Sequence, residues 1–280
     1  MISGLFQYEF LQNAFIAGIL IGFIAPLLGV FIVVRRLSLI ADALSHVTLA
    51  GIAASLLLEK KLGLAGGINP LYMGMAFSVA GSLFIEKLRK VYTHYQELAI
   101  PIILSGGIGL GVIFISLAEG FNTDLFNYLF GSVSAVSRSD MWTVFGISVF
   151  VVLIIIIFYK ELFLLSFDEE HAAASGINSK WIHFLFIVTV ALVIAASMRI
   201  VGILLVSSLM TLPVAASIRI ANGFKQTILF SVIFGEISVI VGLILSYYLD
   251  LAPGGTIVML AVVILIGAIS WKKWWKGRTK

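Results

Sequence analysis

Nine apolar segments, each about as long as a membrane is thick, dominate this chain of 280 residues. A helix needs about 20 apolar residues to cross the hydrocarbon core of a bilayer, where only helices and closed barrels satisfy their own backbone. The segments cover approximately residues 13–34, 39–58, 63–85, 98–118, 140–160, 181–198, 200–219, 226–248 and 254–271. Hydrophobic residues make up 61% of the chain and charged residues 11%. Soluble proteins are nearer half apolar and a quarter charged. The sequence therefore predicts an all-α, polytopic membrane protein.

The third segment is the least regular of the nine. Gly63, Gly66, Gly67 and Pro70 stand at its start, and such residues either shorten a helix or turn it back within the membrane. We therefore expect eight or nine transmembrane helices. No stretch is polar enough to form a sizeable soluble domain, so residues 1–280 are expected to be a single transmembrane domain.

The basic residues give the expected orientation. Cytoplasmic loops of membrane proteins are enriched in Lys and Arg. With nine spans and an external N-terminus, most of the 18 Lys and Arg residues fall on the cytoplasmic side. They are Arg35, Arg36, Lys87, Arg89, Lys90, Lys160, Lys180, Arg219, Lys225, Lys272, Lys273, Lys276, Arg278 and Lys280. We therefore expect the C-terminus in the cytoplasm, and no nucleic-acid partner. We also expect no cleaved signal peptide, because residues 1–13 lack a basic residue.

Asp42 and His46 are the most informative polar residues within a span. Their spacing of four places both side chains on one face of a helix. A carboxylate at membrane depth normally faces the bundle interior or a water-filled path. Carboxylate and imidazole together suit a divalent metal ion such as zinc. His46 lies ten residues after Arg36, about 15 Å along a helix, which places the pair near the midplane. The alternative is a structural pair that joins helices by hydrogen bonds.

Few other residues could act as metal ligands. The chain has no cysteine, so thiolate ligands are excluded. Glu236 is the only other acid deep within a predicted span, where it either adds negative potential to a cation path or pairs with a neighbouring helix. His183, at the start of a span, is expected at the membrane interface. In the fourth segment, Gly107 and Gly111 have the spacing that lets helices approach closely.

The segment Phe167–Asn178 (FDEEHAAASGIN) forms the longest predicted cytoplasmic loop. Asp168 and Glu169 precede an Ala-rich run, which favours a helix N-terminus there, and Gly176 suits a helix C-cap. Ala172 and Ala173 lie within that run. A short helix between spans is either a docking element for a soluble partner or a solvated connector. The residues themselves leave both readings open.

Several catalytic motifs are absent from the sequence. There is no GxxxxGK[ST] phosphate loop, so the chain is not expected to hydrolyse ATP. HExxH and GxSxG motifs are absent too. We therefore expect a protein that is not itself an enzyme.

With these residues in view, the chain resembles the permease subunits of bacterial metal-ion ABC importers, the zinc, manganese and iron group. The resemblance covers nearly the whole length. It is carried by SLIADALSHVTLAG at 38–51, HYQELAIPIILSGGIGLG at 94–111, DLFNYLFGSV at 124–133, FDEEHAAASGI at 167–177, MRIVGILLVSSLMTLPVAAS at 198–217 and GLILSYYLDLAPGGTIV at 242–258.

The resemblance implies a multi-pass protein of the bacterial cell membrane. It implies that Asp42 and His46 bind the passing cation and that the 167–178 segment is a coupling helix on a separate ATPase subunit. Asp168, Glu169, Ala172, Ala173 and Gly176 would form that docking element. The other implied partners are an extracellular metal-binding lipoprotein and a second copy of the permease. Two copies would supply two Asp and two His.

The metal is expected to be a transported substrate, with no permanently bound cofactor. The motif sequences look most like zinc permeases of Gram-positive bacteria, which makes Zn²⁺ the expected ion and Mn²⁺ or iron the alternative. A self-contained channel or carrier for divalent cations is a different class. It would be expected to carry more charged residues across its spans, and only Asp42, His46 and Glu236 lie deep.

Overall fold

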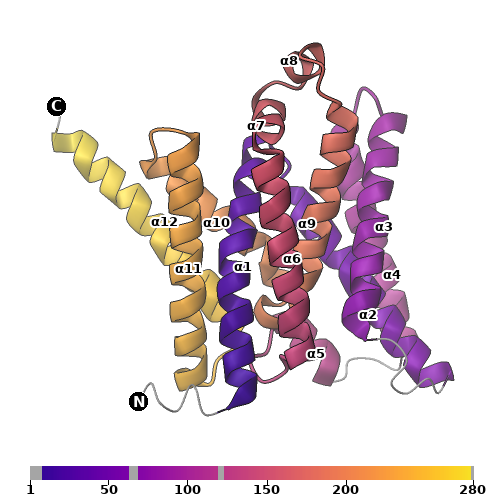
Figure 1. Ribbon diagram of the computed structural model, residues 1–280. Coiled ribbons are helices and arrows are strands. Elements are labelled where there is room, and N and C mark those ends of the chain that lie inside the picture. The colour runs from indigo at the N-terminus through magenta and orange to yellow at the C-terminus, as the bar shows by residue number, and fades with distance from the viewer. Residues whose placement is uncertain (1–7, 63–68, 119–122, 279–280) are drawn as a thin grey trace.

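The computed structural model describes residues 8–62, 69–118 and 123–278. All regular secondary structure in these residues is helical (Figure 1). In chain order the helices are α1 (Glu9–Val34), α2 (Leu39–Leu62), α3 (Pro70–Val91), the 3-10 turn η2 (Gln96–Leu98), α4 (Ala99–Leu117), α5 (Thr123–Phe130), α6 (Arg138–Ile157), α7 (Tyr159–Phe167), α8 (Glu169–Ala174), α9 (Ser179–Val201), α10 (Ile203–Ile220), α11 (Phe224–Leu249) and α12 (Pro253–Arg278).

Eight helices of the described residues are long and apolar enough to cross a membrane, which confirms the predicted fold class. Helix α10 adds a shorter apolar segment, Leu205–Ile220. Helix α1 begins at the end of the bundle that holds α5, and α12 finishes at the end that holds α8 (Figure 1). We call these the α5 end and the α8 end. With α10 counted as a ninth crossing, the number of crossings is odd, as it must be when α1 begins and α12 finishes at opposite ends of the bundle.

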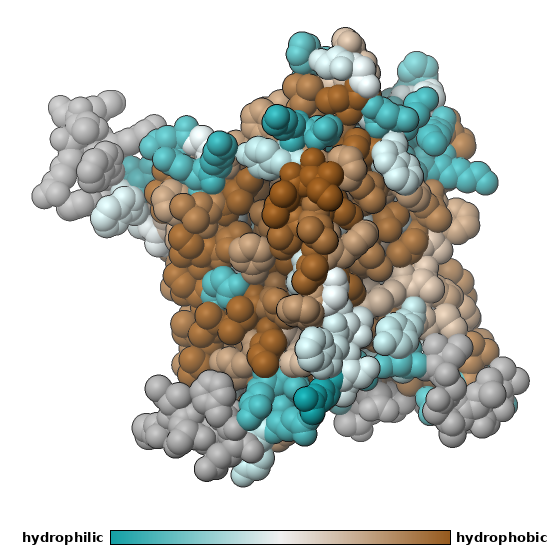
Figure 2. Space-filling view, viewed as in Figure 1, coloured by the Kyte–Doolittle hydropathy of each residue, from teal (hydrophilic) through white to brown (hydrophobic). Residues whose placement is uncertain are grey.

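The surface has the layering that a bilayer requires. On the face that Figure 2 shows, a broad apolar band crosses the middle of the molecule, and most polar side chains gather at the two ends. Large apolar side chains on the long helices, such as Ile156, Val263 and Ile266, are exposed, as expected of positions that face lipid.

The third span differs from its predicted bounds of 63–85. Helix α3 begins at Pro70 and continues to Val91, while residues 63–68 lie outside the described part of the chain. Pro70 is the first helical residue, where its missing N–H costs nothing, and the Asn69 side chain accepts a hydrogen bond from the Leu71 N–H at 3.0 Å. Pro70 therefore starts the span and does not interrupt it.

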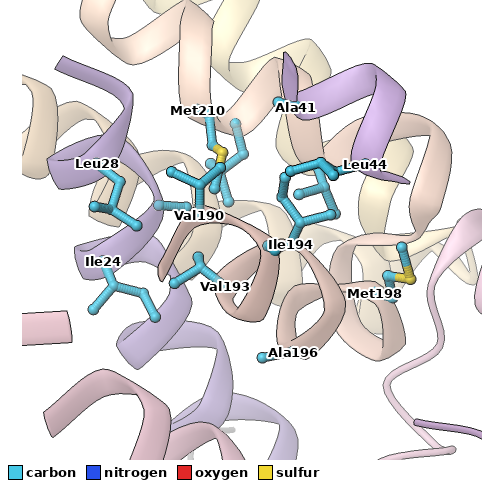
Figure 3. Close-up of a cluster of buried hydrophobic side chains, with 14 of the residues drawn as sticks. Ile24, Leu28, Ala41, Leu44, Val190, Val193, Ile194, Ala196, Met198 and Met210 are labelled. Carbon is cyan, nitrogen blue, oxygen red and sulfur yellow. The ribbon is translucent and has the colours of Figure 1, made fainter. Parts of the chain in front are cut away.

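Helices α1, α2 and α9 are the most buried spans, and α10 packs against all three. Side chains from these four helices meet in the core shown in Figure 3, where Leu28 of α1, Leu44 of α2, Val190 of α9 and Met210 of α10 lie together. The other spans surround this centre: α3 and α4 cover α2, while α11 and α12 lie beyond α1 and α10. Helix α2 is thus held on several sides.

Helices α5, α6, α9 and α10 pack closely together at the α5 end. Gly202 separates α9 from α10 with a φ of 85°, and a Cβ atom there would lie 2.5 Å from the Leu129 carbonyl oxygen. Arg199 donates to the Tyr128 hydroxyl at 3.1 Å and to the Ala135 carbonyl at 3.2 Å, and it pairs with the buried Asp140 carboxylate. These bonds join α5, α6 and α9.

Candidate metal site and docking helix

Helix α2 carries the Asp/His pair, and most of its other residues between Ile40 and Ser55 are buried. Ala41, Leu44 and Thr48 face the core, and Figure 3 shows the first two beside residues of α9 and α10. The buried hydroxyls of Ser45 and Thr48 bond to carbonyl oxygens one turn earlier, at 2.8 and 2.6 Å, so they need no partner on another helix. This face is fixed by apolar packing.

Asp42 and His46 lie on the remaining open stripe of α2. Between Ile40 and Ser55, only Asp42, His46 and Val47 keep part of their surface exposed. At 1.5 Å per residue the two polar residues lie about 5 and 10 Å from Leu39, the first residue of the helix. Both could therefore direct oxygen and nitrogen ligands to a common point outside the single chain's core.

A complete metal site is not formed within one copy. In the ranges 8–62, 69–118 and 123–278, no group of three or more His, Cys, Asp or Glu side chains is placed to hold a metal ion. The pair supplies two ligands, and metals of this class usually take four or more. The residues suit a divalent metal if further ligands come from elsewhere.

Glu236 is not brought to the pair within the single chain. It lies on α11, which packs against α1, α10 and α12, whereas α2 lies on the other side of α1 (Figure 1). Its Oε2 atom is buried without a hydrogen-bond partner and lies 3.3 Å from where a Cβ on Gly22 would stand. This contact places the carboxyl at the α1–α11 interface.

Helix α4 approaches α2 closely beside Asp42 and His46. A Cβ added at Gly107 would lie 2.8 Å from Val47 Cγ2 and 3.2 Å from the carbonyl carbon of His46. One turn later, a Cβ on Gly111 would just touch Ala50, at 3.8 Å. The spacing of these two glycines thus corresponds to a close contact, and that contact supports the backbone that carries His46.

Helix α8 occupies part of the segment singled out as a docking element. Its N-cap is Asp168, whose side chain accepts from the His171 N–H at 2.8 Å, and Gly176 follows the helix with a φ of 81°. Ala172 is fully buried and anchors the helix against the bundle. Asp168, Glu169, Ala173 and Gly176 are exposed. The exposed side of α8 and its flanking residues therefore presents acidic side chains and residues with small or no side chains.

The neighbouring helix α7, which precedes α8 in the chain, is fixed to the bundle by aromatic contacts. Phe163 and Phe167 of α7 contact Phe224 at the start of α11, with ring centroids 5.0 and 5.7 Å apart. Phe224 also packs edge-to-face on Phe31 of α1 at 5.4 Å. These aromatic contacts tie the base of α8 to the central helices.

His183, which was expected at the membrane interface, is buried between helices near the start of α9. It is 4% exposed and contacts Arg35 of the α1–α2 turn and Glu86 of α3. The residues that it joins are far apart in the sequence, so spacing alone did not reveal the cluster. The one local signal is the pair Glu86 and Arg89, three residues apart on α3.

Comparison with known proteins identifies the family. Residues 7–272 match the model of the ABC 3 transport family. The chain is 35% identical over 263 residues to the manganese transport system membrane protein MntC of Listeria monocytogenes, covering 94% of this chain and 91% of the relative. It is 36% identical over 265 residues to the manganese import system permease protein ScaB of Streptococcus gordonii, covering 95% and 92%.

A solved structure agrees with this relationship. The complex described as PsaBC from Streptococcus pneumoniae with Fab contains a chain that superposes with a TM-score of 0.82 at 34% identity, covering 95% of this chain and 93% of that one. Family model, sequence relatives and fold all cover nearly the entire length. The chain therefore belongs to the ABC 3 transport family, the permeases of metal-ion ABC importers that its sequence resembles.

Proposed function

We propose that this protein is the membrane-spanning permease of an ATP-driven importer and that Asp42 and His46 hold a divalent transition-metal ion as it passes. The observation that carries the proposal is the partly exposed stripe on α2. Two potential metal ligands, one turn apart, remain partly exposed in the stretch from Ile40 to Ser55, where every other residue except Val47 is buried. A purely structural pair would be expected to bond to a neighbouring helix, as Arg199 and Asp140 do. In this role the residues 1–280 act as one transport domain.

The assembly that we propose completes the ligand set with a second copy. Two permeases that meet along their α2 stripes would place two carboxylates and two imidazoles around one ion. Four such ligands match the coordination that transition metals take from nitrogen and oxygen. The incomplete pair in the single chain supports this arrangement.

Manganese is the preferred ion in this proposal, with zinc as the second candidate. The Asp/His pair accepts either metal, since carboxylate-rich shells suit manganese and imidazole-rich shells suit zinc. The named relatives are manganese systems, which favours Mn²⁺ over the Zn²⁺ expected from the motif sequences. The ion is cargo in both cases.

The orientation and partners follow from the charges at the two ends. Basic residues at the α8 end, including Arg36, Lys87 and Lys180, favour a cytoplasmic position for that end, an external N-terminus and a cytoplasmic C-terminus. The exposed side of α8 would then face a separate ATPase subunit, with Asp168, Glu169, Ala173 and Gly176 at the contact and Ala172 as its anchor. A metal-binding lipoprotein would deliver the ion to the α5 end.

Metal uptake by cells that lack their other manganese and zinc importers tests the proposal. Asp42→Asn and His46→Gln keep side-chain size and should each reduce uptake to background, because each replaces an anionic or imidazole ligand by a neutral, weakly coordinating amide. His94→Gln, at an exposed histidine of the α3–α4 connection, is the matched control and should transport normally. Competition between Mn²⁺ and Zn²⁺ in the wild type decides the ion. Normal uptake by either site variant would overturn the assignment.

A further inference from the structure

A buried polar cluster lies at the α8 end of the central helices. Arg35 Nη2 donates to His183 Nδ1 at 2.5 Å, and His183 Nε2 lies 2.5 Å from Glu86 Oε1. Arg89 contacts both His183 Nε2 and Glu86, and it donates to the Gln96 side chain at 3.1 Å. We call Arg35, Glu86, Arg89 and His183 the His183 network. It joins the α1–α2 turn, α3 and α9.

The two ring nitrogens of His183 face different partners. A guanidinium has donors and no acceptor, so Nδ1 accepts from Arg35. Nε2 lies against both the Glu86 carboxylate and the Arg89 guanidinium. The imidazole therefore connects an arginine on one helix with a glutamate on another through directional bonds.

The network does not have the character of a metal site. Two guanidinium groups contact the only two groups that could act as ligands, His183 and Glu86, so a cation would meet positive charge there. Burial lowers the pKa of Arg35 to about 10, an effect that the nearby Glu169 carboxylate opposes, and Arg35 therefore keeps its charge at neutral pH. Its guanidinium also lies 5.4 Å from the ring centroid of Phe186. The cluster holds helices together.

Short, hydrogen-bonded connections lead from the network to both proposed functional elements. On one side, Leu37 donates to the Ile32 carbonyl at 2.9 Å and Ile40 donates to the Leu37 carbonyl at 2.9 Å, so the turn after Arg35 continues firmly into α2. Asp42 follows Arg35 by seven residues. A shift of Arg35 would therefore be carried directly to the metal pair.

The other side leads to α8. After the buried Ala172, Ile177 donates back to the Ala172 carbonyl at 3.2 Å, and Asn178 caps α9 by accepting from the Trp181 N–H at 3.2 Å. His183 is the fifth residue of α9. Glu169 of α8 also acts electrostatically on Arg35. A displacement of α8 thus reaches the network through one short connection and through charge.

We propose that the His183 network transmits movement of α8 to α2 and so couples ATP hydrolysis in the partner subunit to release of the metal at Asp42 and His46. The proposal rests on the function proposed above, because it needs α8 as the docking helix and α2 as the metal-binding helix. The four residues act as positioning residues. Directional bonds that span three elements, in place of apolar packing alone, are what allow a defined shift to pass between them.

The test uses the permease with its ATPase subunit, reconstituted in liposomes and supplied with MnCl₂ or, in parallel, ZnCl₂. The ratio of metal transported to ATP hydrolysed is measured. His183→Leu should continue to hydrolyse ATP while the ratio falls at least about fivefold, the lower end of ordinary coupling between sites. His183→Gln should restore much of the ratio, because its amide can accept from Arg35 and donate to Glu86. A role in stability alone would lower the amount of complex and leave the ratio unchanged.

Two further variants keep the test decisive. His94→Leu makes the same change at an exposed histidine and should keep the wild-type ratio. Arg89→Met removes an arm of the network whose side chain is 20% accessible, and should lower the ratio in the same direction if His183→Leu fails to assemble. A wild-type ratio in assembled His183→Leu, or in Arg89→Met where the former does not assemble, overturns the proposal. Normal transport by Asp42→Asn would instead overturn the proposed function.

Discussion

Two neighbouring glycines of α4 are expected to respond in opposite ways to the same added methyl group. Gly107→Ala places a Cβ 2.8 Å from Val47 Cγ2 and 2.9 Å from the Val47 nitrogen, so α4 must move away from α2 beside His46. Overpacking of this kind costs about 1–3 kcal/mol. Gly106→Ala meets nothing within 4 Å, and alanine favours a helix over glycine by about 1 kcal/mol.

Thermal unfolding in detergent and metal uptake together check this pair. Gly107→Ala should lower both the unfolding temperature and uptake, while Gly106→Ala should keep uptake and unfold at the same or a higher temperature. Equal behaviour of the two variants would show that the close approach of α4 does not support the metal pair.

At the scale of residues, the sequence predicted what local spacing determines. The four-residue interval puts Asp42 and His46 on one helical face, and Gly107 and Gly111 do lie against α2. It did not predict the burial of His183, because the partners of that side chain stand 148 and 94 residues away in the chain. Such contacts depend on how helices pack, which periodicity does not encode.

The short helix α8 is expected to behave as a contact surface whose two alanines differ. Ala173 is exposed and Ala172 fully buried. Ala173→Arg should leave the permease folded, since exposed substitutions usually change stability by less than about 0.5 kcal/mol. It should nevertheless abolish copurification of the ATPase, because a long cationic side chain would separate the two surfaces. Thr93→Arg, on the exposed α3–α4 connection, is the control and should copurify normally. Undiminished copurification with Ala173→Arg would place the docking surface elsewhere.

At the scale of elements, long apolar spans were predictable and short helices were harder. Burial in a bilayer imposes a length of about 20 residues, which the sequence displays directly. Helix α5 has only eight residues and was not predicted. The third span begins at Pro70 and not at residue 63, because proline serves there as a helix start. The segment that contains α8 stood out because acids precede alanines at an N-terminus.

The whole molecule presents the two proposed metal ligands, Asp42 and His46, on a helix that is packed on several sides. The fold class and family were predictable from the sequence, since nine apolar segments and several motifs extend over nearly all of it. The complete ligand shell was not predictable from spacing, because in our account it forms only when two copies meet. The same assembly would place two α8 helices on two ATPase subunits, so that one movement acts on both halves of the site.

The metal content of the purified permease–ATPase complex tests this account most directly. The complex is equilibrated with MnCl₂, passed through a desalting column, and analysed for metal and protein. Sharing of four ligands predicts about one bound ion for every two permease copies, with loss of that ion in both Asp42→Asn and His46→Gln. Full retention of bound metal in either variant would contradict the central claim that these two residues hold the transported ion.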